Sequence, residues 1–370
     1  MHILLVAPYF GGSHQAWAEG YAQASQHRIS LVTHAARFWK WRMQGGAATL
    51  AQEARTVEET PDLILTTDML NLPAFLALTR DVFAHVPVAL YCHENQLTYP
   101  WPPGERRDLT YAVINWLSML AADRVYFNSD YHLDAWYREV PRLLKHFPDY
   151  GHLPMLANVR KRSVVLPVGC DLARFGDTPD RDHLPETPLI LWNQRWEYDK
   201  DPATFFRALD ALVDAGISFR VALAGSNERQ MPGEFLAARE RLGDRVVHFG
   251  RADPDTYVRL LRQADVVVST ALHEFFGIAV VEAIYCGCFP VLPRRLSYPE
   301  IIPPQHHSAC LYGSFEDLVE RLRWCLTHRS SAHRIAKDLR EEVHPFDWSV
   351  LVTRYDDELE QLVRQPHRRS

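Results

Sequence analysis

The sequence predicts an α/β protein made of two Rossmann-like, doubly wound domains in series. The chain has 370 residues, which is too long for one compact core and fits two domains of ordinary size. Short apolar, β-branched runs alternate with segments of helical periodicity, as they do in parallel βαβ units. The alternation stops between Val164 and Pro188, where Pro, Asp and Gly accumulate, and then restarts. We therefore expect two parallel sheets joined by a linker.

Five apolar runs in each half read as buried parallel strands, because they are short and are bounded by Pro, Asp, Asn or Gly. In the first half they are HILLVAP, RISLVTH, DLILTT, VPVALYCHEN and RVYFNS, with helices expected at residues 15–24 and 109–122. In the second half they are LILWNQ, FRVALAG, RVVHFG, DVVVSTA and CFPVLP. A last helix is expected at residues 348–363. The predicted division is 1–168 for the N-terminal domain, 169–187 for the linker, 188–345 for the C-terminal domain, and 346–370 for a helix, which can cross back to the first domain, and a basic tail.

Composition limits the class of protein. A net charge of −6 excludes a surface coated in positive charge but permits a local basic patch. No run approaches the roughly 20 apolar residues of a membrane span. The N-terminal MHILLVAPYF lacks the basic segment of a signal peptide and reads as a first strand, so a cytoplasmic location is expected. The six cysteines form no CxxC pair, which favours reduced thiols over a metal site.

The segment HEFFGIAVVEA, residues 273–283, follows the predicted strand DVVVSTA and carries two carboxylates. On one helix Glu274 and Glu282 would lie about 80° apart in angle and roughly 12 Å apart along the axis, so each could meet a different end of a ligand. The free N–H groups of the turn at residues 275–278 would suit a phosphate. The alternative is an ordinary amphipathic helix with solvated carboxylates.

The segment WNQRWEYDKDP, residues 192–202, places Arg195 and Lys200 after the first strand of the second half. Ligands bind at the carboxyl ends of strands in such sheets. A guanidinium and an ammonium there can bind a diphosphate and neutralise it as it leaves. The alternative is a solvated loop in which both cations pair with Glu197 and Asp199.

Two further segments follow strands of the first half. In YFGGSH, Gly11 and Gly12 permit close backbone approach to a ligand, although a plain turn explains them equally well. In YCHENQLTYP, His93 and Glu94 end a strand, and a histidine there can hold or move a proton near neutral pH. The alternative for His93 is a hydrogen-bonded structural role. The motifs GxGxxG and GxxxxGK[ST] do not occur, which disfavours a dinucleotide or P-loop site.

In this order, the glycine-rich first loop, the strand-end histidine, the Arg and Lys five apart and the Glu-x7-Glu element resemble the family 4 retaining glycosyltransferases, which have the GT-B fold. Longer strings are more specific: GGSH, WKWR, HENQLTYP, RWEYDKDP, HEFFGIAVVEAIYCGCFP and YPEIIP are similar to the tRNA-queuosine α-mannosyltransferase family. This resemblance covers nearly the whole chain.

The resemblance implies transfer of mannose from GDP-mannose to the cyclopentenediol of queuosine, at the wobble position of tRNA-Asp, with retained anomeric configuration. It implies no metal, no other cofactor, no membrane contact and no protein nucleophile, since the leaving phosphate takes the acceptor proton. Its partners would be GDP-mannose and queuosine-containing tRNA, the latter on the N-terminal domain.

The resemblance also implies site roles, residue by residue. Arg195 and Lys200 would bind the donor diphosphate, Glu274 the sugar hydroxyls and Glu282 the ribose. The backbone of Phe276, Gly277 and Ile278 would bind phosphate, Gly11 and Gly12 would admit the diphosphate or acceptor, and His93 would orient the sugar or acceptor hydroxyl.

The segment ARFWKWRM, residues 36–43, combines three cations with three aromatic residues. A nucleotide-sugar site does not need such a patch, but an anticodon loop offers phosphates and unpaired bases. We expect tRNA contacts from Arg37, Trp39, Lys40, Trp41 and Arg42. The alternative is that the Trp side chains pack on the first domain.

Two other functions stay open. A family 4 enzyme acting on a lipid carrier or polysaccharide would need a basic amphipathic helix in the first domain. Residues 136–145 are basic but weakly amphipathic, and Pro141 is expected to interrupt them. A non-catalytic RNA- or nucleotide-binding module would have no need for Arg195, Lys200, Glu274 and Glu282 together.

Overall fold

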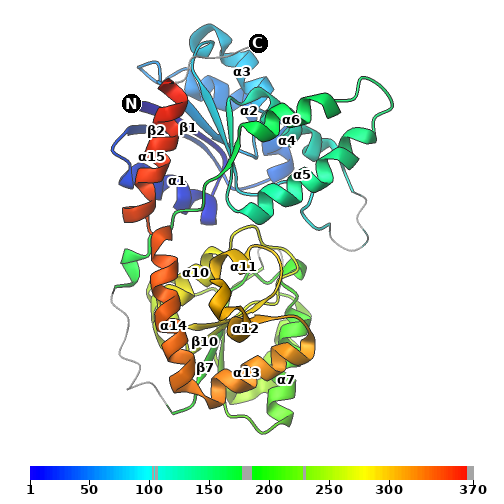
Figure 1. The fold of residues 1–370 in the computed structure, drawn as a ribbon, viewed down its shortest axis with the longest axis vertical. Coiled ribbons are helices and arrows are strands. Elements are labelled where there is room, and N and C mark those ends of the chain that lie inside the picture. The colour runs from blue at the N-terminus through cyan, green and yellow to red at the C-terminus, as the bar shows by residue number, and fades with distance from the viewer. Residues whose placement is uncertain (102–103, 105–106, 177–185, 228–230, 365–370) are drawn as a thin grey trace. The chain divides into compact units, whose positions relative to one another are not determined.

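The computed structural model describes residues 1–101, 104, 107–176, 186–227 and 231–364. The chain divides into two compact units, one formed by Met1–Asp171 with Trp348–Ser370 and the other by Leu172–Asp347. Each unit is a parallel six-stranded sheet with helices on both faces, so the predicted α/β architecture is confirmed (Figure 1). Residues 177–185 of the predicted linker and 365–370 of the predicted tail lie outside the described residues.

Unit 1 contains six strands in the order β2-β1-β3-β4-β5-β6. The strands are β1 His2–Phe10, β2 Arg28–Ala35, β3 Leu63–Thr67, β4 Val88–Cys92, β5 Arg124–Phe127 and β6 Ser163–Val165. The main helices are α1 Gly12–Ala24, α2 Trp39–Ala54, α3 Leu72–Phe83, α4 Thr110–Ala121, α5 Asp130–Lys145, α6 Leu156–Lys161 and α15 Trp348–Arg364.

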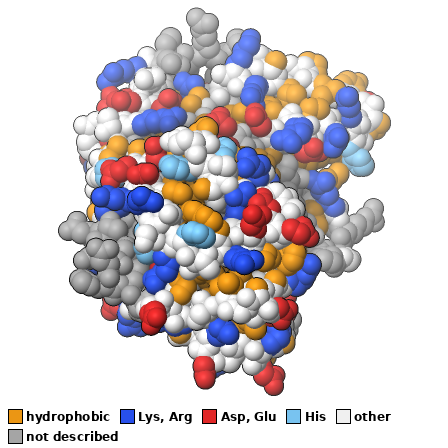
Figure 2. All heavy atoms as spheres, turned by 60° about the horizontal axis from the view of Figure 1, so that its bottom comes forward, with side chains coloured by type: hydrophobic (Ala, Val, Ile, Leu, Met, Phe, Trp, Pro, Cys, Tyr) orange, Lys and Arg blue, Asp and Glu red, His pale blue; other side chains and the backbone are white. Residues whose placement is uncertain are grey.

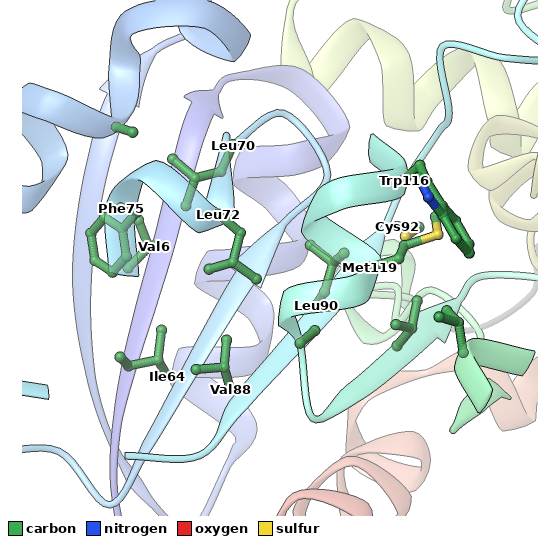
Figure 3. Close-up of a cluster of buried hydrophobic side chains, with 14 of the residues drawn as sticks. Val6, Ile64, Leu70, Leu72, Phe75, Val88, Leu90, Cys92, Trp116 and Met119 are labelled. Carbon is green, nitrogen blue, oxygen red and sulfur yellow. The ribbon is translucent and has the colours of Figure 1, made fainter. Parts of the chain in front are cut away.

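The core of unit 1 follows from the alternation of side chains along these strands. One face of the sheet presents residues such as Val6, Ile64 and Val88 to apolar side chains of α2–α5, including Phe75 and Trp116 (Figure 3). These side chains are almost completely removed from water. Because both faces of a parallel sheet are covered, its strands read as continuous apolar runs.

Helices α1 and α15 cover the other face of unit 1. Trp17 of α1 stacks on Tyr91 of β4 with ring centroids 4.5 Å apart, and its indole donates a 3.0 Å hydrogen bond to the Tyr355 hydroxyl of α15. Asp356 of α15 accepts a 2.9 Å hydrogen bond from the Tyr21 hydroxyl. The C-terminal helix therefore belongs to the first unit, as expected for a helix that crosses back.

Unit 2 has the strand order β12-β11-β10-β7-β8-β9. The strands are β7 Leu189–Trp192, β8 Arg220–Ala224, β9 Val246–Gly250, β10 Val266–Val268, β11 Phe289–Pro293 and β12 Leu311–Tyr312. The main helices are α7 Pro202–Asp214, α8 Gly233–Leu242, α9 Pro254–Gln263, α10 Ile278–Tyr285, α11 Tyr298–Ile301, α12 His307–Cys310, α13 Phe315–Thr327 and α14 Arg329–Val343.

Three local expectations are wrong. The sequence pattern missed the short edge strands β6 and β12, and β6 overlaps the start of the segment Val164–Pro188, in which the alternation was expected to stop. Pro141 does not interrupt its helix, because α5 runs through it from Asp130 to Lys145. Burial of Val140 and Leu143 on either side of the proline offsets the hydrogen bond that its missing N–H would have made.

The distribution of charged side chains on one face of the molecule can be compared with the expectation from the net charge of −6. On the face drawn in Figure 2, basic and acidic side chains are interspersed, and basic side chains do not form a continuous coat. Any basic contact surface on this face must therefore be local.

Candidate active site

In unit 2 the sheet order brings two of the predicted segments together. Strands β7 and β10 are parallel neighbours, with Ile190 paired to Val266, so the loops that follow them lie at the same edge of the sheet. The loops are joined directly: the backbone N–H of Leu272 donates to the Asp199 carbonyl at 2.8 Å, and the Thr270 hydroxyl donates to the Lys200 carbonyl at 2.8 Å.

Lys200 is at the centre of a buried charged group. Its ammonium donates to the His273 carbonyl at 2.8 Å and to Oε2 of Glu274 at 3.2 Å, and it lies 3.3 Å from Oδ2 of Asp199. Its side chain is only 7% exposed. We call Asp199, Lys200, His273 and Glu274 the lysine cluster. Two carboxylates thus share one buried ammonium, as a charge removed from water requires.

The electrostatics of the lysine cluster fix two protonation states. Burial alone would raise the pKa of Glu274, but the Lys200 ammonium, followed by His273, brings it below its usual value. Burial, followed by the Lys200 charge, lowers the pKa of His273 to about 4. At neutral pH Glu274 is therefore an anion and His273 is neutral.

Arg195 lies at the rim of this group. Its Nη1 donates to Oε2 of Glu197 at 3.0 Å, its Nη2 lies 3.9 Å from Oδ2 of Asp199, and its side chain is 56% exposed. The pairing of Arg195 and Lys200 with Glu197 and Asp199, which was the alternative to a binding role, is therefore present. Lys200 also contacts Glu274 and its side chain is buried, so this part of the loop is not solvated as that alternative held.

The helix after β10 begins later than expected. Gly277 has φ of 105° and precedes α10, which spans Ile278–Tyr285. Glu274 therefore lies in the loop and Glu282 in the helix, so the separation estimated for one continuous helix does not apply. The left-handed φ favours glycine at this position. No side chain caps the first N–H groups of α10 within the described part of the chain, which leaves the helix N-terminus with Phe276 and Ile278 suited to an anion.

Glu282 is 9% exposed, and each of its carboxylate oxygens accepts a hydrogen bond. Arg174 donates to Oε1 at 2.6 Å, and the Tyr257 hydroxyl donates to Oε2 at 2.7 Å. Neither partner was singled out from the sequence, because Arg174 and Tyr257 are 108 and 25 residues away from Glu282 and belong to no local motif. Glu282 is thus not a solvated carboxylate.

In unit 1 the two glycines differ in role. A Cβ on Gly11 would lie 2.5 Å from the Cβ of Ala36, so packing between β1 and the end of β2 excludes a side chain there. Gly12 starts α1 with φ of 54°, and a Cβ would meet nothing within 4 Å. The Gly12 backbone is therefore open to close approach by a ligand. Gly11, in contrast, is explained by packing within unit 1.

His93 follows β4 and lies among other rings. Its ring centroid is 4.3 Å from that of His14 and 4.7 Å from that of Trp17. Burial, followed by the charges of His14 and His132, lowers the pKa of His93 well below its usual value. The expectation that His93 titrates near neutral pH is therefore wrong. It is a neutral imidazole whose buried Nε2 has no hydrogen-bond partner among the described residues.

Asp68 fixes the backbone at this histidine. Its Oδ1 accepts a 2.8 Å hydrogen bond from the His93 N–H, and the Asn128 side chain donates to the His93 carbonyl at 2.9 Å. Burial, followed by the Glu94 carboxylate, raises the pKa of Asp68 well above its usual value. Asp68 was missed from the sequence, although it directly follows the strand run DLILTT and lies where β3 and β4 finish side by side.

The predicted tRNA patch divides into two kinds of residue. Trp39 packs on Tyr111 with centroids 4.9 Å apart, and Arg42 donates to the Ala35 carbonyl at 3.2 Å. These two side chains therefore have structural partners, as the packing alternative held. Arg37 and Lys40 are exposed, and Trp41 is 60% exposed.

The exposed group includes a residue that the sequence analysis did not select. Phe38 is 79% exposed and precedes α2 with φ of 51°. A left-handed phenylalanine is strained, and such strain gathers at functional sites. We call Arg37, Phe38, Lys40 and Trp41 the aromatic patch.

Two family models match the chain. The model described as tRNA-queuosine alpha-mannosyltransferase N-terminal matches residues 2–170, and the model described as glycosyl transferases group 1 matches residues 178–342. The tRNA-queuosine alpha-mannosyltransferase of Drosophila melanogaster is 32% identical over 331 residues, which are 87% of this chain and 86% of that protein. The chain belongs to this family. It is a glycosyltransferase, and the family predicted from its motifs is confirmed.

More distant relatives share parts of the chain or only its fold. A GDP-mannose-dependent alpha-(1-6)-phosphatidylinositol dimannoside mannosyltransferase of Mycobacterium tuberculosis is 28% identical over 193 residues, half of this chain and 49% of that protein. Among solved structures, sucrose-phosphate synthase from Thermosynechococcus elongatus has a TM-score of 0.73 at 17% identity, covering 98% of this chain and 99% of that chain. The catalytic domain of starch synthase IV from Arabidopsis thaliana has a TM-score of 0.74 at 12% identity, covering 99% and 100%. These structures support the GT-B fold.

The described residues also bear on membrane-spanning helices and metal-binding groups. None of the helices there is both long and apolar enough to cross a bilayer. The same residues contain no group of three or more His, Cys, Asp or Glu side chains that could hold a metal ion.

Proposed function

We propose that this chain transfers mannose from GDP-mannose to the cyclopentenediol of queuosine at the wobble position of tRNA-Asp, with retention of configuration. The observation that carries the proposal is the 32% identity, over 87% of the chain, to a tRNA-queuosine alpha-mannosyltransferase. The aromatic patch lies within residues 2–170, the part matched by the family-specific model.

Unit 2 would bind the donor. Arg195 and Lys200 would bind the diphosphate, Glu274 the mannose hydroxyls and Glu282 the ribose, with phosphate also at the N-terminus of α10. Support comes from the contact between Lys200 and Glu274, since a cation for the diphosphate and an anion for sugar hydroxyls lie 3.2 Å apart. The same site could then bind both the sugar and the phosphate that are joined by the bond to be broken.

In the proposed step the bond from the mannose anomeric carbon to the β-phosphate oxygen breaks, and a bond to the queuosine hydroxyl oxygen forms on the same face. The proton of that hydroxyl passes to the leaving GDP. Arg195 and Lys200 would offset the charge that develops on the phosphate, and neutral His93 would orient a hydroxyl. The scheme uses no metal and no protein nucleophile, so transfer should persist in a chelator.

Unit 1 would bind the tRNA. Phe38 and Trp41 offer exposed ring faces for unpaired bases, and Arg37 and Lys40 offer charges for phosphates. Trp39 and Arg42, which we also expected to contact RNA, would act mainly by holding the start of α2. Support for this division is the packing of Trp39 on Tyr111 and the bond from Arg42 to Ala35.

The proposal is tested by incubating the purified protein with GDP-mannose and tRNA-Asp that carries either queuosine or guanosine, followed by mass analysis of the nucleosides. A hexose added only to queuosine is the expected result. UDP-glucose and UDP-galactose replace GDP-mannose in parallel reactions, and transfer from either of them instead would overturn the donor assignment.

A lipid-linked or polysaccharide acceptor is the second candidate, since a Mycobacterium relative is named for a phosphatidylinositol mannoside. Helix α5 offers little support, because its apolar residues Leu133, Trp136, Val140, Leu143 and Leu144 are buried in the core of unit 1. Mannose incorporated into a lipid extract, with none in tRNA, would favour this candidate. GDP binding without transfer to either acceptor would favour a non-catalytic module.

A further inference from the structure

Glu282 is held by a chain of hydrogen bonds that starts at the end of β7. The Asn193 side-chain nitrogen donates to the Tyr257 hydroxyl at 3.2 Å, and that hydroxyl donates to Oε2 of Glu282 at 2.7 Å. Arg174 donates to the other oxygen at 2.6 Å. Side chains from the loop after β7, from α9 and from the segment before β7 are therefore linked to one carboxylate of α10.

The direction of each bond in this chain is determined. Asn193 also donates to the Ala279 carbonyl at 2.8 Å, and a carbonyl can only accept, so the atom beside Tyr257 is the amide nitrogen. A hydroxyl has one proton, and because its oxygen accepts from Asn193, that proton points to Glu282. Burial, followed by the Glu282 charge, raises the pKa of Tyr257 well above its usual value, so the proton stays in place at any working pH.

We propose that Tyr257, oriented by Asn193, is a positioning residue that holds the Glu282 carboxylate where it accepts the ribose hydroxyls of the donor nucleotide. This inference rests on the proposed use of Glu282 for ribose. Arg174 holds the second oxygen at 2.6 Å, so the group cannot rotate. A carboxylate fixed in this way loses little rotational freedom when a diol binds.

An unpaired atom in the same network also indicates a ligand. Asn193 is 8% exposed, and its buried Oδ1 has no hydrogen-bond partner in the described part of the chain. A buried acceptor without a donor is costly unless a bound molecule supplies one. In this proposal a ribose hydroxyl of the nucleotide supplies the missing donor.

The experiment measures nucleotide binding by calorimetry, without turnover. GDP, UDP and ADP are each compared with their 2′,3′-dideoxy forms, in the wild type and in Tyr257→Phe. We expect Tyr257→Phe to weaken binding of the normal nucleotide about 10-fold, the loss of a hydrogen bond to a charged group, and to leave binding of the dideoxy form unchanged. Tyr312→Phe is the matched control, because it removes a buried hydroxyl that donates to the Ser269 carbonyl at 3.0 Å and does not touch Glu282.

The outcomes separate this inference from the proposed function. Equal weakening of the normal and dideoxy nucleotides by Tyr257→Phe would make Tyr257 merely structural and overturn the inference. Binding of UDP or ADP in place of GDP would overturn the proposed donor and still test Tyr257, and binding of none would overturn both. If Tyr257→Phe does not fold, Asn193→Ala replaces it and should show the same ribose-specific loss, because it frees the Tyr257 hydroxyl to turn away.

Discussion

The lysine cluster of unit 2 and the aromatic patch of unit 1 are built in opposite ways. Lys200 has a side chain that is 7% exposed, and protein groups surround its ammonium. Trp41 is 60% exposed, and its ring lies against Gly45, where a Cβ would come within 2.6 Å of it. One site is closed around a paired ammonium, whereas the other offers open ring faces.

The difference fits two kinds of ligand. A small charged group gains most from donors that are fixed and dehydrated before it arrives, because little reorganisation is then needed. A nucleic acid is large and gains from stacking and phosphate contacts spread over an exposed surface. Variants in the two regions should therefore fail differently, the first in chemistry and folding, the second in acceptor binding alone.

The largest effect is expected from Lys200→Met. It should lower the rate of transfer about 1,000-fold, because it removes a fixed donor to the developing phosphate charge. It should also lower the free energy of unfolding by about 3 kcal/mol, because Asp199 and Glu274 would remain buried without their shared cation. Turnover and urea unfolding measure the two quantities.

A second substitution tests the reason for that loss of stability. Glu274→Gln in the Lys200→Met background removes one of the two stranded charges, and part of the stability should return while activity stays lost. Lys337→Met, at an exposed lysine of the same unit, is the control. A Lys200→Met protein as stable as the wild type would mean that the cluster is solvated, and the contrast with the aromatic patch would disappear.

The next effect is a pH dependence that belongs to His273. Its pKa is about 4 in the folded state and about 6.5 when unfolded, so the unfolded chain binds more protons between these values. Stability therefore rises with pH across this window, and about 3 kcal/mol is lost as the pH falls from 6.5 to 4. Unfolding of His273→Gln, measured from pH 7 to 4, should lack this part of the slope.

The control for this prediction is His344→Gln, which replaces an exposed histidine of unit 2 and should keep the wild-type slope. Comparing each variant with the wild type at every pH removes most of the titration of Glu274, whose lowered pKa also favours higher pH, because Lys200, the main cause of that lowering, is unchanged. Identical slopes for His273→Gln and the wild type would show that His273 is already solvated.

A smaller effect is expected in the aromatic patch. Trp41→Ala and Phe38→Ala should each weaken binding of queuosine tRNA about 10-fold, within the range for one stacked base, and leave GDP binding unchanged. Trp39→Ala should instead lower the melting temperature, because Trp39 packs on Tyr111. Leu78→Ala, at an exposed apolar residue of unit 1, controls for general surface effects. Weakened GDP binding in Trp41→Ala would make the patch part of the donor site.

The two halves and their parallel strands were predictable, because parallel strands that are buried on both faces appear as uninterrupted apolar runs. The edge strands β6 and β12 were not predictable, because strands of three and two residues are too short to show an alternating pattern. The continuation of α5 through Pro141 was not predictable, because the helix is stabilised by its burial in the core of unit 1. Local pattern therefore predicts central elements better than edges.

Candidate site residues could be selected from the sequence where they lie in short motifs, as Arg195, Lys200 and Glu274 do. The contact between Lys200 and Glu274 depends on β7 and β10 being neighbours, which no single motif states. Tyr257 and Arg174 were missed because their link to Glu282 crosses 25 and 108 residues. The protonation of His93 was predicted wrongly, because burial among His14, His132 and Trp17 is a property of the fold.

The smallest effect concerns the strain at Phe38, and it separates stability from binding within one residue. Phe38 has φ of 51°, a left-handed conformation that costs a residue with a side chain about 1 kcal/mol and glycine nothing. Phe38→Gly should therefore be as stable as the wild type or more stable by up to about 1 kcal/mol, while tRNA binding weakens as in Phe38→Ala. Phe38→Ala keeps the strain, so the difference between these two variants in urea unfolding isolates it. A Phe38→Gly protein that is less stable than Phe38→Ala would mean that the left-handed backbone stores no strain. Loss of stability in both variants relative to the wild type would mean that the ring packs at the start of α2, and that it serves folding rather than the acceptor.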